Sequence, residues 1–478
     1  MNVLAIDQGT SATKALLLCP ERGPLGQGSA PVRPRPTADG GIEQDPLELL
    51  DSVLLAGRQA LADGGEPAGA VGLANQGETV LTWDRGTGEP LSPAISWQDR
   101  RSAGVCDRLV ASGAAEKLTA LTGLPVDPYF AAPKMAWLRA TGRTDGVVTT
   151  TDSWLLHRLT GAFVTDAATA SRTLLLDLDG VDWSDEACAA FGLDRNGLPE
   201  VVDCAGPIGG TTAFGGALPV TGLAVDQQAA LFAQACFAPG DAKCTYGTGA
   251  FLLATTGPRA ARSTAGLSAS VAWRLAGDTT YCLDGQAYTA GAAVRWLGEL
   301  GLIEDAADLD RLGGAVPDAG GAVFVPGLAG LGAPQWRPLA RGAFTGLTLG
   351  TTREHLVRAV VEGLAAQVAV LANAVAADLG RPLSRLRVDG GLTKSRLLMQ
   401  LQADLLQVPV ERHASADATA LGVAALARLG SGQAVSVEKA VGPVAPVERI
   451  EPRMGAGEAS SLMAQFEAAV AATTELGS

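Results

Sequence analysis

The chain has 478 residues, 47% of them hydrophobic and 18% charged, which predicts a soluble globular protein of two or three domains. Its 36 basic and 50 acidic residues give a net charge of -14, and this excess of acid argues against a nucleic-acid-binding surface. A small anionic ligand stays compatible, because one local site can be positive on an acidic protein.

Targeting signals and metal-binding patterns are not evident. Asp7 interrupts the first apolar stretch before a signal-peptide core could form, and no uninterrupted apolar run reaches the roughly 18 residues of a membrane span. The 7 cysteines are scattered without zinc-like or C-x-x-C spacing, so we expect reduced thiols in a cytoplasmic protein. His157, His355 and His413 lie far apart in the sequence, which disfavours a histidine-based metal site or a Ser-His triad.

The first predicted element is the stretch VLAIDQGTSATKALLL, from Val3 to Leu18. An apolar run ends at Asp7, breaks at small polar residues and resumes, the pattern of two strands joined by a tight turn. Such a turn can present N–H groups and hydroxyls to phosphate, with Lys14 adding charge and Asp7 holding Mg²⁺ through water. A plain hairpin is the alternative. It is not a Walker A loop, because GTSATK lacks the glycine before the lysine.

Polar and aromatic residues follow in two short segments. LANQGETVLTWD places Gln76 and Glu78 at a strand end, and AISWQDRRS adds Trp97. Further along, GLAVDQQAAL places Asp226 between an apolar strand and a helix-like stretch. A carboxylate there could take the proton of an alcohol that attacks a γ-phosphorus. Read separately, the first two segments would be surface or loop, and Asp226 a helix cap.

A second strand–turn–strand unit occurs at DAKCTYGTGAFLLATT, from Asp241 to Thr256. Two such units, separated by about half the chain, suggest two related domains. The turn-rich APGD just before the second unit favours a boundary near residue 236, with domains at residues 1–235 and 236–478. Two hairpins facing each other across a cleft could hold a triphosphate from both sides.

Helical signals dominate the second half. Thr351 followed by Glu354 predicts a capping box, and the apolar pattern after it predicts a helix ending at Gly380. LSRLRVDGGLTKSRLLMQLQADLLQVPV then reads as a strand, a double glycine and a helix, and a further helix runs from about Asp417 to Leu429. Strands alternating with long helices predict an α/β fold. The double glycine offers bare backbone to a nucleotide.

Together these segments resemble the FGGY family of carbohydrate kinases, and within it the glycerol kinases. The resemblance also covers DPYF, DSWLLHRLTG, VTDAATASRT, AGAAVRWL, FVPGLAGLGAPQWRPLARG and DATALGVA, in the family's order over nearly the whole chain. It implies two actin-like (ribonuclease H-like, ASKHA superfold) domains with a catalytic cleft between them. ATP and Mg²⁺ are the implied co-substrate and metal, and domain closure is implied during turnover.

The resemblance also assigns roles to individual residues. Asp226 matches the catalytic base and Asp7 the magnesium-associated acid. The positions matching the acceptor pocket are Gln76, Gly77, Glu78, Trp97, Tyr129, Asp226, Gln227 and Phe251. The positions matching the nucleotide and phosphate site are Thr10, Ser11, Lys14, Thr248, Gly249, Gly291, Arg295, Gly391 and Ser395. Lys14, Ser395 and Arg295 stand where glycerol kinases usually have Arg, Asn and Gln.

Two departures bear on the substrate and on regulation. The chain has NQGET where glycerol kinases have NQRET, so Gly77 lacks a guanidinium and leaves space the size of a long side chain. We therefore expect another, longer polyol or sugar to be preferred, or glycerol to be handled poorly. GPIGGTTAFGGALPVTG contains no Lys or Arg where bacterial glycerol kinases bind fructose 1,6-bisphosphate, so inhibition by this effector is not expected.

The sequence thus predicts an ATP-dependent kinase of a small polyol or sugar, with no nucleic-acid partner; a homodimer is compatible with it. Within this class, glycerol kinase proper competes with a pentulose (xylulokinase-like) or tetritol kinase. The alternatives outside it are a non-transferring actin-like ATPase switch and a kinase-derived sugar-binding regulator. Glu78, Trp97, Tyr129 and Asp226 together disfavour the switch, and the retained Asp7, Thr248 and Asp226 disfavour an inactive regulator.

Overall fold

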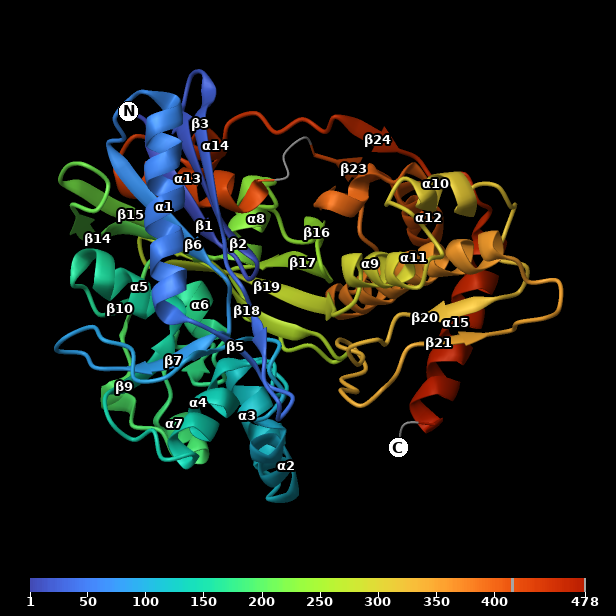
Figure 1. Ribbon diagram of the computed structural model, residues 1–478, viewed down its shortest axis with the longest axis horizontal. Helices are drawn as coiled ribbons and strands as arrows, with labels where there is room; N and C mark the ends of the chain where they lie inside the picture. The colour runs from blue at the N-terminus through green and yellow to red at the C-terminus, as the bar shows by residue number, and fades with distance from the viewer. Residues whose placement is uncertain (414–416, 477–478) are drawn as a thin grey trace.

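The framework of the protein is one large mixed sheet in a computed structural model that describes residues 1–413 and 417–476. In spatial order its strands are β24 (Glu448–Ile450), β23 (Val410–Arg412), β22 (Leu386–Asp389), β16 (Ala242–Tyr246), β17 (Ala250–Gly257), β19 (Asp278–Ala287), β18 (Ser268–Leu275), β14 (Ala205–Thr211), β15 (Leu218–Val225), β6 (Ala70–Asn75), β1 (Val3–Gln8), β2 (Ala12–Cys19) and β3 (Gly23–Pro31). Strands from the two halves of the chain occupy opposite sides of this sheet and meet where Ala205 pairs with Leu275 (Figure 1). The boundary expected near residue 236 falls between the two sets and stays a prediction.

Both predicted strand pairs form. β1 runs antiparallel to β2, and β16 runs antiparallel to β17. The first turn closes through the N–H of Gly9, which donates to the carbonyl of Ala12 at 3.1 Å, and the second through Gly247 N–H to the carbonyl of Gly249 at 2.9 Å. Each first strand also has a parallel neighbour, β6 or β22. The two turns therefore follow the carboxyl ends of parallel strands, where α/β sheets place their ligands.

Helix α11 (Arg353–Leu379) confirms the long helix but corrects its cap. Thr352, not Thr351, is the N-cap, and its N–H donates to Nδ1 of His355 at 3.2 Å in place of the expected Glu354. The shift has a local cause, because the hydroxyl of Thr351 accepts from the N–H of Thr348 in the preceding turn. Gly380 ends the helix with a φ of 67°, as predicted.

The two helices predicted after it also form, as α12 (Arg396–Leu406) and α13 (Ala418–Gly430). Although α13 comes late in the chain, it lies against the first-half strands (Figure 1). A Cβ at Gly72 of β6 would come within 2.6 Å of the Val423 carbonyl oxygen, and one at Gly222 of β15 within 2.8 Å of the same atom. The missing side chains of these two glycines allow the close approach.

A smaller sheet carries the acceptor-side loops. Its strands, in spatial order, are β4 (Arg35–Pro36), β5 (Ile42–Gln44), β8 (Ala94–Ile95), β7 (Val80–Trp83) and β9 (Val147–Thr150). Two-stranded sheets pair β10 (Val164–Asp166) with β13 (Glu200–Val202), β11 (Leu176–Asp177) with β12 (Asp182–Trp183), and β20 (Val323–Val325) with β21 (Ala343–Thr345). The smaller sheet therefore positions the turns that precede β7 and follow β8.

The remaining helices cover the sheets and close the ends of the molecule (Figure 1). They are α1 (Pro46–Gly64), α2 (Ala103–Ala111), α3 (Ala114–Thr122), α4 (Ala131–Ala140), α5 (Thr151–Thr160), α6 (Ala167–Ser171), α7 (Asp185–Phe191), α8 (Asp226–Ala233), α9 (Gly291–Glu299), α10 (Asp308–Gly313), α14 (Val437–Val441), α15 (Ala456–Leu476) and the 3-10 turns η1 (Arg195–Gly197) and η2 (Gly391–Lys394).

Two compositional expectations can be compared with the fold. Among the described residues, α11 is the one helix long and apolar enough to cross a membrane, and 83% of that stretch is buried inside the molecule. Its apolar composition thus matches its place in the core. All seven cysteines are buried and free, as their spacing predicted.

Candidate active site

The two hairpin turns line one cavity of about 210 Å³. Thr10 and Ser11 contribute from the first turn, and Gly247 and Thr248 from the second. The residues predicted for acceptor binding all line it as well: Gln76, Gly77, Glu78, Trp97, Tyr129, Asp226, Gln227 and Phe251. The fold therefore brings the predicted phosphate hairpins and the predicted acceptor residues to one place, which we call the acceptor cavity.

The wall on the side of the smaller sheet is tied to the first hairpin. Nε1 of Trp97 donates to Oγ1 of Thr10 at 2.8 Å, so the indole and the first turn are fixed relative to each other. Glu78 adopts a left-handed backbone with a φ of 59°, a conformation that is costly for a residue other than glycine. With this backbone, Glu78 lines the cavity two residues before β7 begins.

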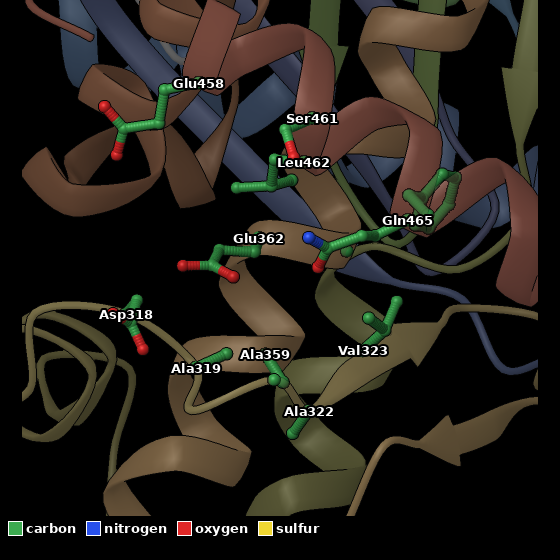
Figure 2. Close-up of a pocket in the computed structure, with 13 residues that line it drawn as sticks. Asp318, Ala319, Ala322, Val323, Ala359, Glu362, Glu458, Ser461, Leu462 and Gln465 are labelled. Carbon is green, nitrogen blue, oxygen red and sulfur yellow. The ribbon is translucent and has the colours of Figure 1, made fainter.

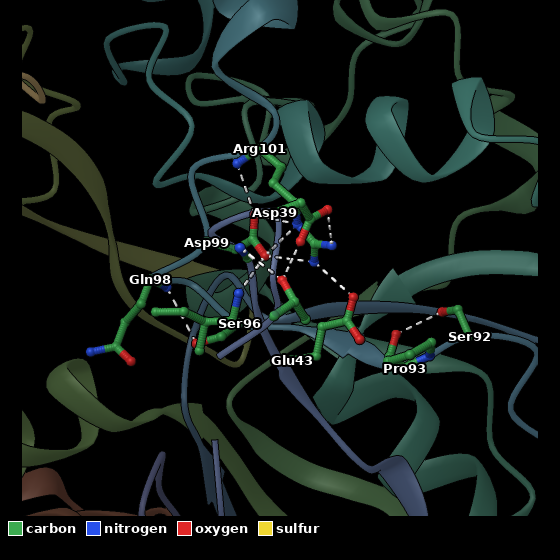
Figure 3. A network of polar contacts seen from close by, with 11 residues as sticks. Asp39, Glu43, Ser92, Pro93, Ser96, Gln98, Asp99 and Arg101 are labelled. Atoms are coloured by element: carbon green, nitrogen blue, oxygen red, sulfur yellow. Dashed lines mark hydrogen bonds and ion pairs between the residues drawn. The ribbon is translucent and has the colours of Figure 1, made fainter. Parts of the chain in front are cut away.

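A network of charges holds the loop that carries Trp97 (Figure 3). The Arg101 guanidinium pairs with Asp99 at 2.7 Å, with Glu43 at 2.8 Å and with Asp39 at 3.2 Å. Asp99 is buried and also accepts the N–H of Ile42 at 2.8 Å. Because these bonds join the loop after β8 to β5, they limit how far the Trp97 side chain can move.

Hydrogen bonds to the backbone around Tyr129 fix the position of this residue. Its N–H donates to Oδ1 of Asp127 at 2.8 Å, while Nζ of the buried Lys134 donates to the carbonyls of Pro128 at 3.0 Å and Tyr129 at 2.6 Å, and also to that of Phe130. Burial lowers the pKa of Lys134 to about 7. The lysine thus satisfies the carbonyls that precede α4 and fixes the segment bearing the Tyr129 ring.

Arg172 and Asp284 are cavity residues that sequence reasoning did not single out. Nε of Arg172 donates to Oε1 of Glu78 at 2.7 Å, and Nη1 lies 2.8 Å from Oδ2 of Asp284. All three side chains are buried. The chain motif around Arg172 was part of the family resemblance, but its partners are remote in sequence, and no local pattern indicates the contact. Burial raises the pKa of Glu78, and the nearby guanidinium opposes this rise.

Asp226 begins α8 at the end of β15, and its carboxylate reaches the acceptor cavity. Burial raises its pKa, while Lys243 and the N–H of Gln227, which donates to Oδ1 at 2.7 Å, oppose the rise. Nζ of Lys243 donates to Oε1 of Gln227 at 2.6 Å. A buried carboxylate with a raised pKa is a stronger base than an exposed one, which suits proton abstraction near neutral pH.

Asp7 lies at the end of β1, close enough to Asp226 for repulsion between the two carboxylates. Burial and this repulsion raise the pKa of Asp7 to about 7. Asp7 is not among the described residues that line the acceptor cavity, but it is coupled to Asp226, which lines the cavity together with Thr10 and Thr248. Two neighbouring carboxylates fit Mg²⁺, which binds through one or two carboxylates, phosphate oxygens and water. No group of three or more metal-ligating side chains occurs within residues 1–413 and 417–476, so a metal here would depend on ligand oxygens.

A second cavity, of about 590 Å³, adjoins the first at the second hairpin. Gly247 and Thr248 line both cavities. Of the residues predicted to bind nucleotide, Thr248, Gly291, Arg295 and Gly391 line it. A Cβ at Gly291 would lie 2.6 Å from the Gly247 carbonyl oxygen, so this glycine lets α9 approach the turn. We call this space the nucleotide cavity.

Three predicted nucleotide or phosphate residues are not among the described residues that line these two cavities. Nζ of Lys14 pairs with Oδ1 of Asp417 at 3.1 Å, and Lys14 lines a separate surface cavity. The hydroxyl of Ser395 donates to Oδ1 of Asp310 at 2.6 Å and accepts the N–H of Leu398 as the N-cap of α12. Gly249 packs against the backbone of β19, where a Cβ would lie 2.5 Å from the Ala287 carbonyl oxygen.

Another cavity, of about 320 Å³, lies between α11, β20 and α15 (Figure 2). Asp318, Glu362 and Glu458 give it an acidic lining, and Oε1 of Glu362 accepts from Nε of Arg358 at 2.6 Å. Its described lining residues include none of the predicted site residues. It is therefore separate from the candidate active site.

Comparison with known families covers almost the whole chain. The N-terminal domain of the FGGY family of carbohydrate kinases matches residues 2–233, and the C-terminal domain matches residues 242–430. The glycerol kinase of Aromatoleum aromaticum is 44% identical over 98% of this chain and 98% of its own length. The glycerol kinase of Myxococcus xanthus is 45% identical over 90% of each.

Solved structures show the same two-domain α/β fold that the sequence predicted. The glycerol kinase of Plasmodium falciparum with ADP superposes with a TM-score of 0.89 at 31% identity, covering 99% of this chain and 98% of that one. The xylulose kinase of Lactobacillus acidophilus has a TM-score of 0.89 at 21% identity over 100% of both chains. The chain therefore belongs to the FGGY family of carbohydrate kinases and is an ATP-dependent kinase of a polyol or sugar.

Proposed function

We propose that the enzyme transfers the γ-phosphoryl group of ATP to a primary hydroxyl of a small, neutral polyol or ketose. The observation that carries this proposal is the meeting of two cavities at Gly247 and Thr248, with Asp226 on the acceptor side. ATP in the nucleotide cavity would direct its γ-phosphate to the hairpin turns. An alcohol between Glu78, Tyr129 and Asp226 would then lie next to that phosphate.

In this mechanism Asp226 accepts the proton of the attacking hydroxyl while the oxygen–phosphorus bond forms and ADP leaves. Its raised pKa supports the role, because a carboxylate with a higher pKa accepts a proton more readily. The turns around Thr10 and Thr248 offer hydroxyls and N–H groups to the transferring phosphoryl group. Mg²⁺ bound near Asp7 would neutralise phosphate charge.

The charges around the acceptor cavity support a neutral acceptor. Glu78, Asp226 and Asp284 line it with carboxylates, and Arg172 is the cation among its described lining residues. An acidic sugar would therefore meet a net negative field in a buried site, which disfavours binding. The glycerol kinases and the Rhodospirillum rubrum xylulose kinase among the similar proteins are named for neutral acceptors, which agrees with this preference, whereas a gluconate kinase at 21% identity shares the fold.

Within the neutral acceptors, glycerol and longer compounds compete. The 44% identity to the Aromatoleum aromaticum glycerol kinase favours glycerol, whereas Gly77 in place of the usual arginine favours another acceptor. An ATPase switch without an acceptor is an alternative outside this class. Such a switch does not require a cavity in which Asp226 lies with Glu78, Trp97 and Tyr129.

The test is ADP release in the presence and absence of candidate alcohols, for the natural chain and for Asp226→Asn. We expect a suitable alcohol to stimulate ADP release, and the substitution to lower kcat by at least about 100-fold because the base is lost. Asp107→Asn, on the exposed face of α2, is the matched control and should keep full activity. Equal ADP release with and without every alcohol would refute the proposed function.

A further inference from the structure

Next to the acceptor cavity, β19 carries two buried polar side chains on one face. Asp284, which lines the cavity, is followed two residues later by Gln286, and both side chains are more than nine-tenths buried. Among the described residues, Oδ1 of Asp284 and both ends of the Gln286 amide have no hydrogen-bond partner. Unpaired buried polar atoms of this kind are rare and costly unless a ligand satisfies them.

The strand register places Gln286 on the sheet face that borders the acceptor cavity. Gln286 stands opposite Phe251 of β17, and Asp284 stands opposite Leu253. Directly opposed residues share a face of the sheet, as do residues two apart on one strand, so Gln286 shares the face of the cavity residues Phe251 and Asp284. The intervening Gly285 faces the other way, where its Cβ would meet Leu371 of α11 at 2.8 Å.

Arg172 links Asp284 to the predicted acceptor residues. Its Nε is hydrogen-bonded to Glu78, and its Nη1 forms an ion pair with Oδ2 of Asp284 at 2.8 Å. The cavity lining thus holds a free acceptor, Oδ1 of Asp284, beside the guanidinium of Arg172. The Gln286 amide adds an unpaired donor and an unpaired acceptor on the same sheet face. The Gln286 amide lies near the Tyr288 hydroxyl, yet the two form no hydrogen bond of normal geometry within the part of the chain described.

These groups exceed what a three-carbon acceptor can satisfy. A triol has one hydroxyl for transfer near Asp226 and two for Glu78 and its neighbours, which leaves the free groups on Asp284 and Gln286 without hydroxyls to bind. We infer that Arg172, Asp284 and Gln286 form a distal subsite that binds the far hydroxyls of a neutral four- or five-carbon polyol or ketose. This inference rests on the proposed function and specifies its acceptor.

The distal subsite makes these side chains determinants of specificity. An acceptor that supplies hydroxyls to the buried groups gains hydrogen bonds, whereas glycerol leaves them unpaired. The same groups weaken the free protein, because burying an unpaired amide opposes folding. A purely structural Gln286 would have the opposite effect on stability, so the melting temperature separates the two roles.

The experiment compares the natural chain with Gln286→Leu, using glycerol and a panel of neutral tetritols, pentitols, tetruloses and pentuloses. In the natural chain we expect kcat/KM for at least one longer acceptor to exceed that for glycerol by roughly tenfold or more. The substitution should lower kcat/KM for that acceptor by roughly tenfold and change kcat/KM for glycerol by less than about threefold. It should not lower the Tm of the unliganded protein.

Gln367→Leu is the matched control. Gln367 is also buried, with both ends of its amide unpartnered among the described residues, but it lies on α11, which covers the opposite face of β19. Its substitution should leave the ratio of kcat/KM for the longer acceptor to kcat/KM for glycerol unchanged. Asp284→Asn provides a second variant of the subsite. It should lower kcat/KM for the longer acceptor more than kcat/KM for glycerol, as Gln286→Leu does.

A natural chain that prefers glycerol over the whole panel would overturn the distal subsite while leaving the proposed kinase activity intact. Equal losses for glycerol and the longer acceptor in Gln286→Leu would also overturn it, as would a lowered Tm. If no alcohol stimulates ADP release at all, the proposed function itself fails, which is a distinguishable result.

Discussion

At the residue scale, Gly77 is the position where the structure changes an expectation most. The sequence suggested that the missing arginine leaves open space. In the structure, a Cβ at Gly77 would lie 2.9 Å from Cγ2 of the buried Val225. The space beside Gly77 is thus partly filled by a neighbouring valine, a contact between residues that are remote in sequence and that no local motif could indicate.

This contact predicts the effect of Gly77→Ala. The added methyl must displace Val225, so the free energy of unfolding should fall by about 1 kcal/mol, and the KM for the acceptor should rise severalfold while the KM for ATP stays constant. Chemical denaturation and steady-state kinetics measure both effects. The double variant Gly77→Ala/Val225→Ala should recover the acceptor KM of Val225→Ala alone; an acceptor KM unaffected by Gly77→Ala would contradict the prediction.

The site residues differ in how far sequence could predict them. Thr10, Thr248 and Asp226 belong to short local patterns, a turn or a strand end, that the sequence predicts and the structure contains. Arg172 and Asp284 act through an ion pair between distant segments, so their position in the acceptor cavity depends on the tertiary fold. Ser395 shows the converse case, since its hydroxyl caps α12 and binds Asp310, whereas the family pattern placed it beside the nucleotide.

At the scale of elements, the start of α4 depends on one buried lysine. Lys134 donates to carbonyls of three consecutive residues, from Pro128 to Phe130, and these carbonyls belong to the segment that presents Tyr129. Three acceptors use all three ammonium protons. The lysine therefore couples the helix to the acceptor wall.

Lys134→Met should loosen this segment without touching the ligand. Leaving the carbonyls unpaired should cost roughly 2 kcal/mol of folding free energy, and the KM for the acceptor should rise while the KM for ATP does not. Denaturation and acceptor titrations check the two parts. Lys117→Met, at an exposed lysine of α3 whose side chain is 74% accessible, should change stability by less than about 0.5 kcal/mol; equal effects of the two variants would argue against the coupling.

Element boundaries show the same dependence on local competition. The sequence predicted the long helix α11 from its apolar repeat and its terminal Gly380. It misplaced the capping box by one residue, because Thr351 bonds the preceding turn and Thr352 is left to cap the helix. Periodicity identifies a helix, but the choice between adjacent threonines is decided by hydrogen bonds that the sequence alone does not reveal.

At the scale of the whole molecule, the two halves of the chain occupy opposite sides of one sheet, and α13 of the second half packs on the first. Each half supplies one hairpin to the acceptor cavity, as the repeated pattern predicted. The position of α13 was not predictable in this way. Its packing against β6 and β15 depends on Gly72 and Gly222, which lie far from α13 in the sequence and let its backbone approach the two strands. The two-domain α/β fold followed from the order of motifs, whereas the contacts between the halves follow from the tertiary structure.

The most direct test of the central claim is to follow the label from ATP carrying radioactive γ-phosphate. With a suitable neutral alcohol, we expect the label to appear in the alcohol's monophosphate, one for each ADP formed, and Asp226→Asn to suppress the transfer. Closure of the site against water should keep release of labelled inorganic phosphate low. Label released as inorganic phosphate at the same rate with and without every alcohol would contradict the account.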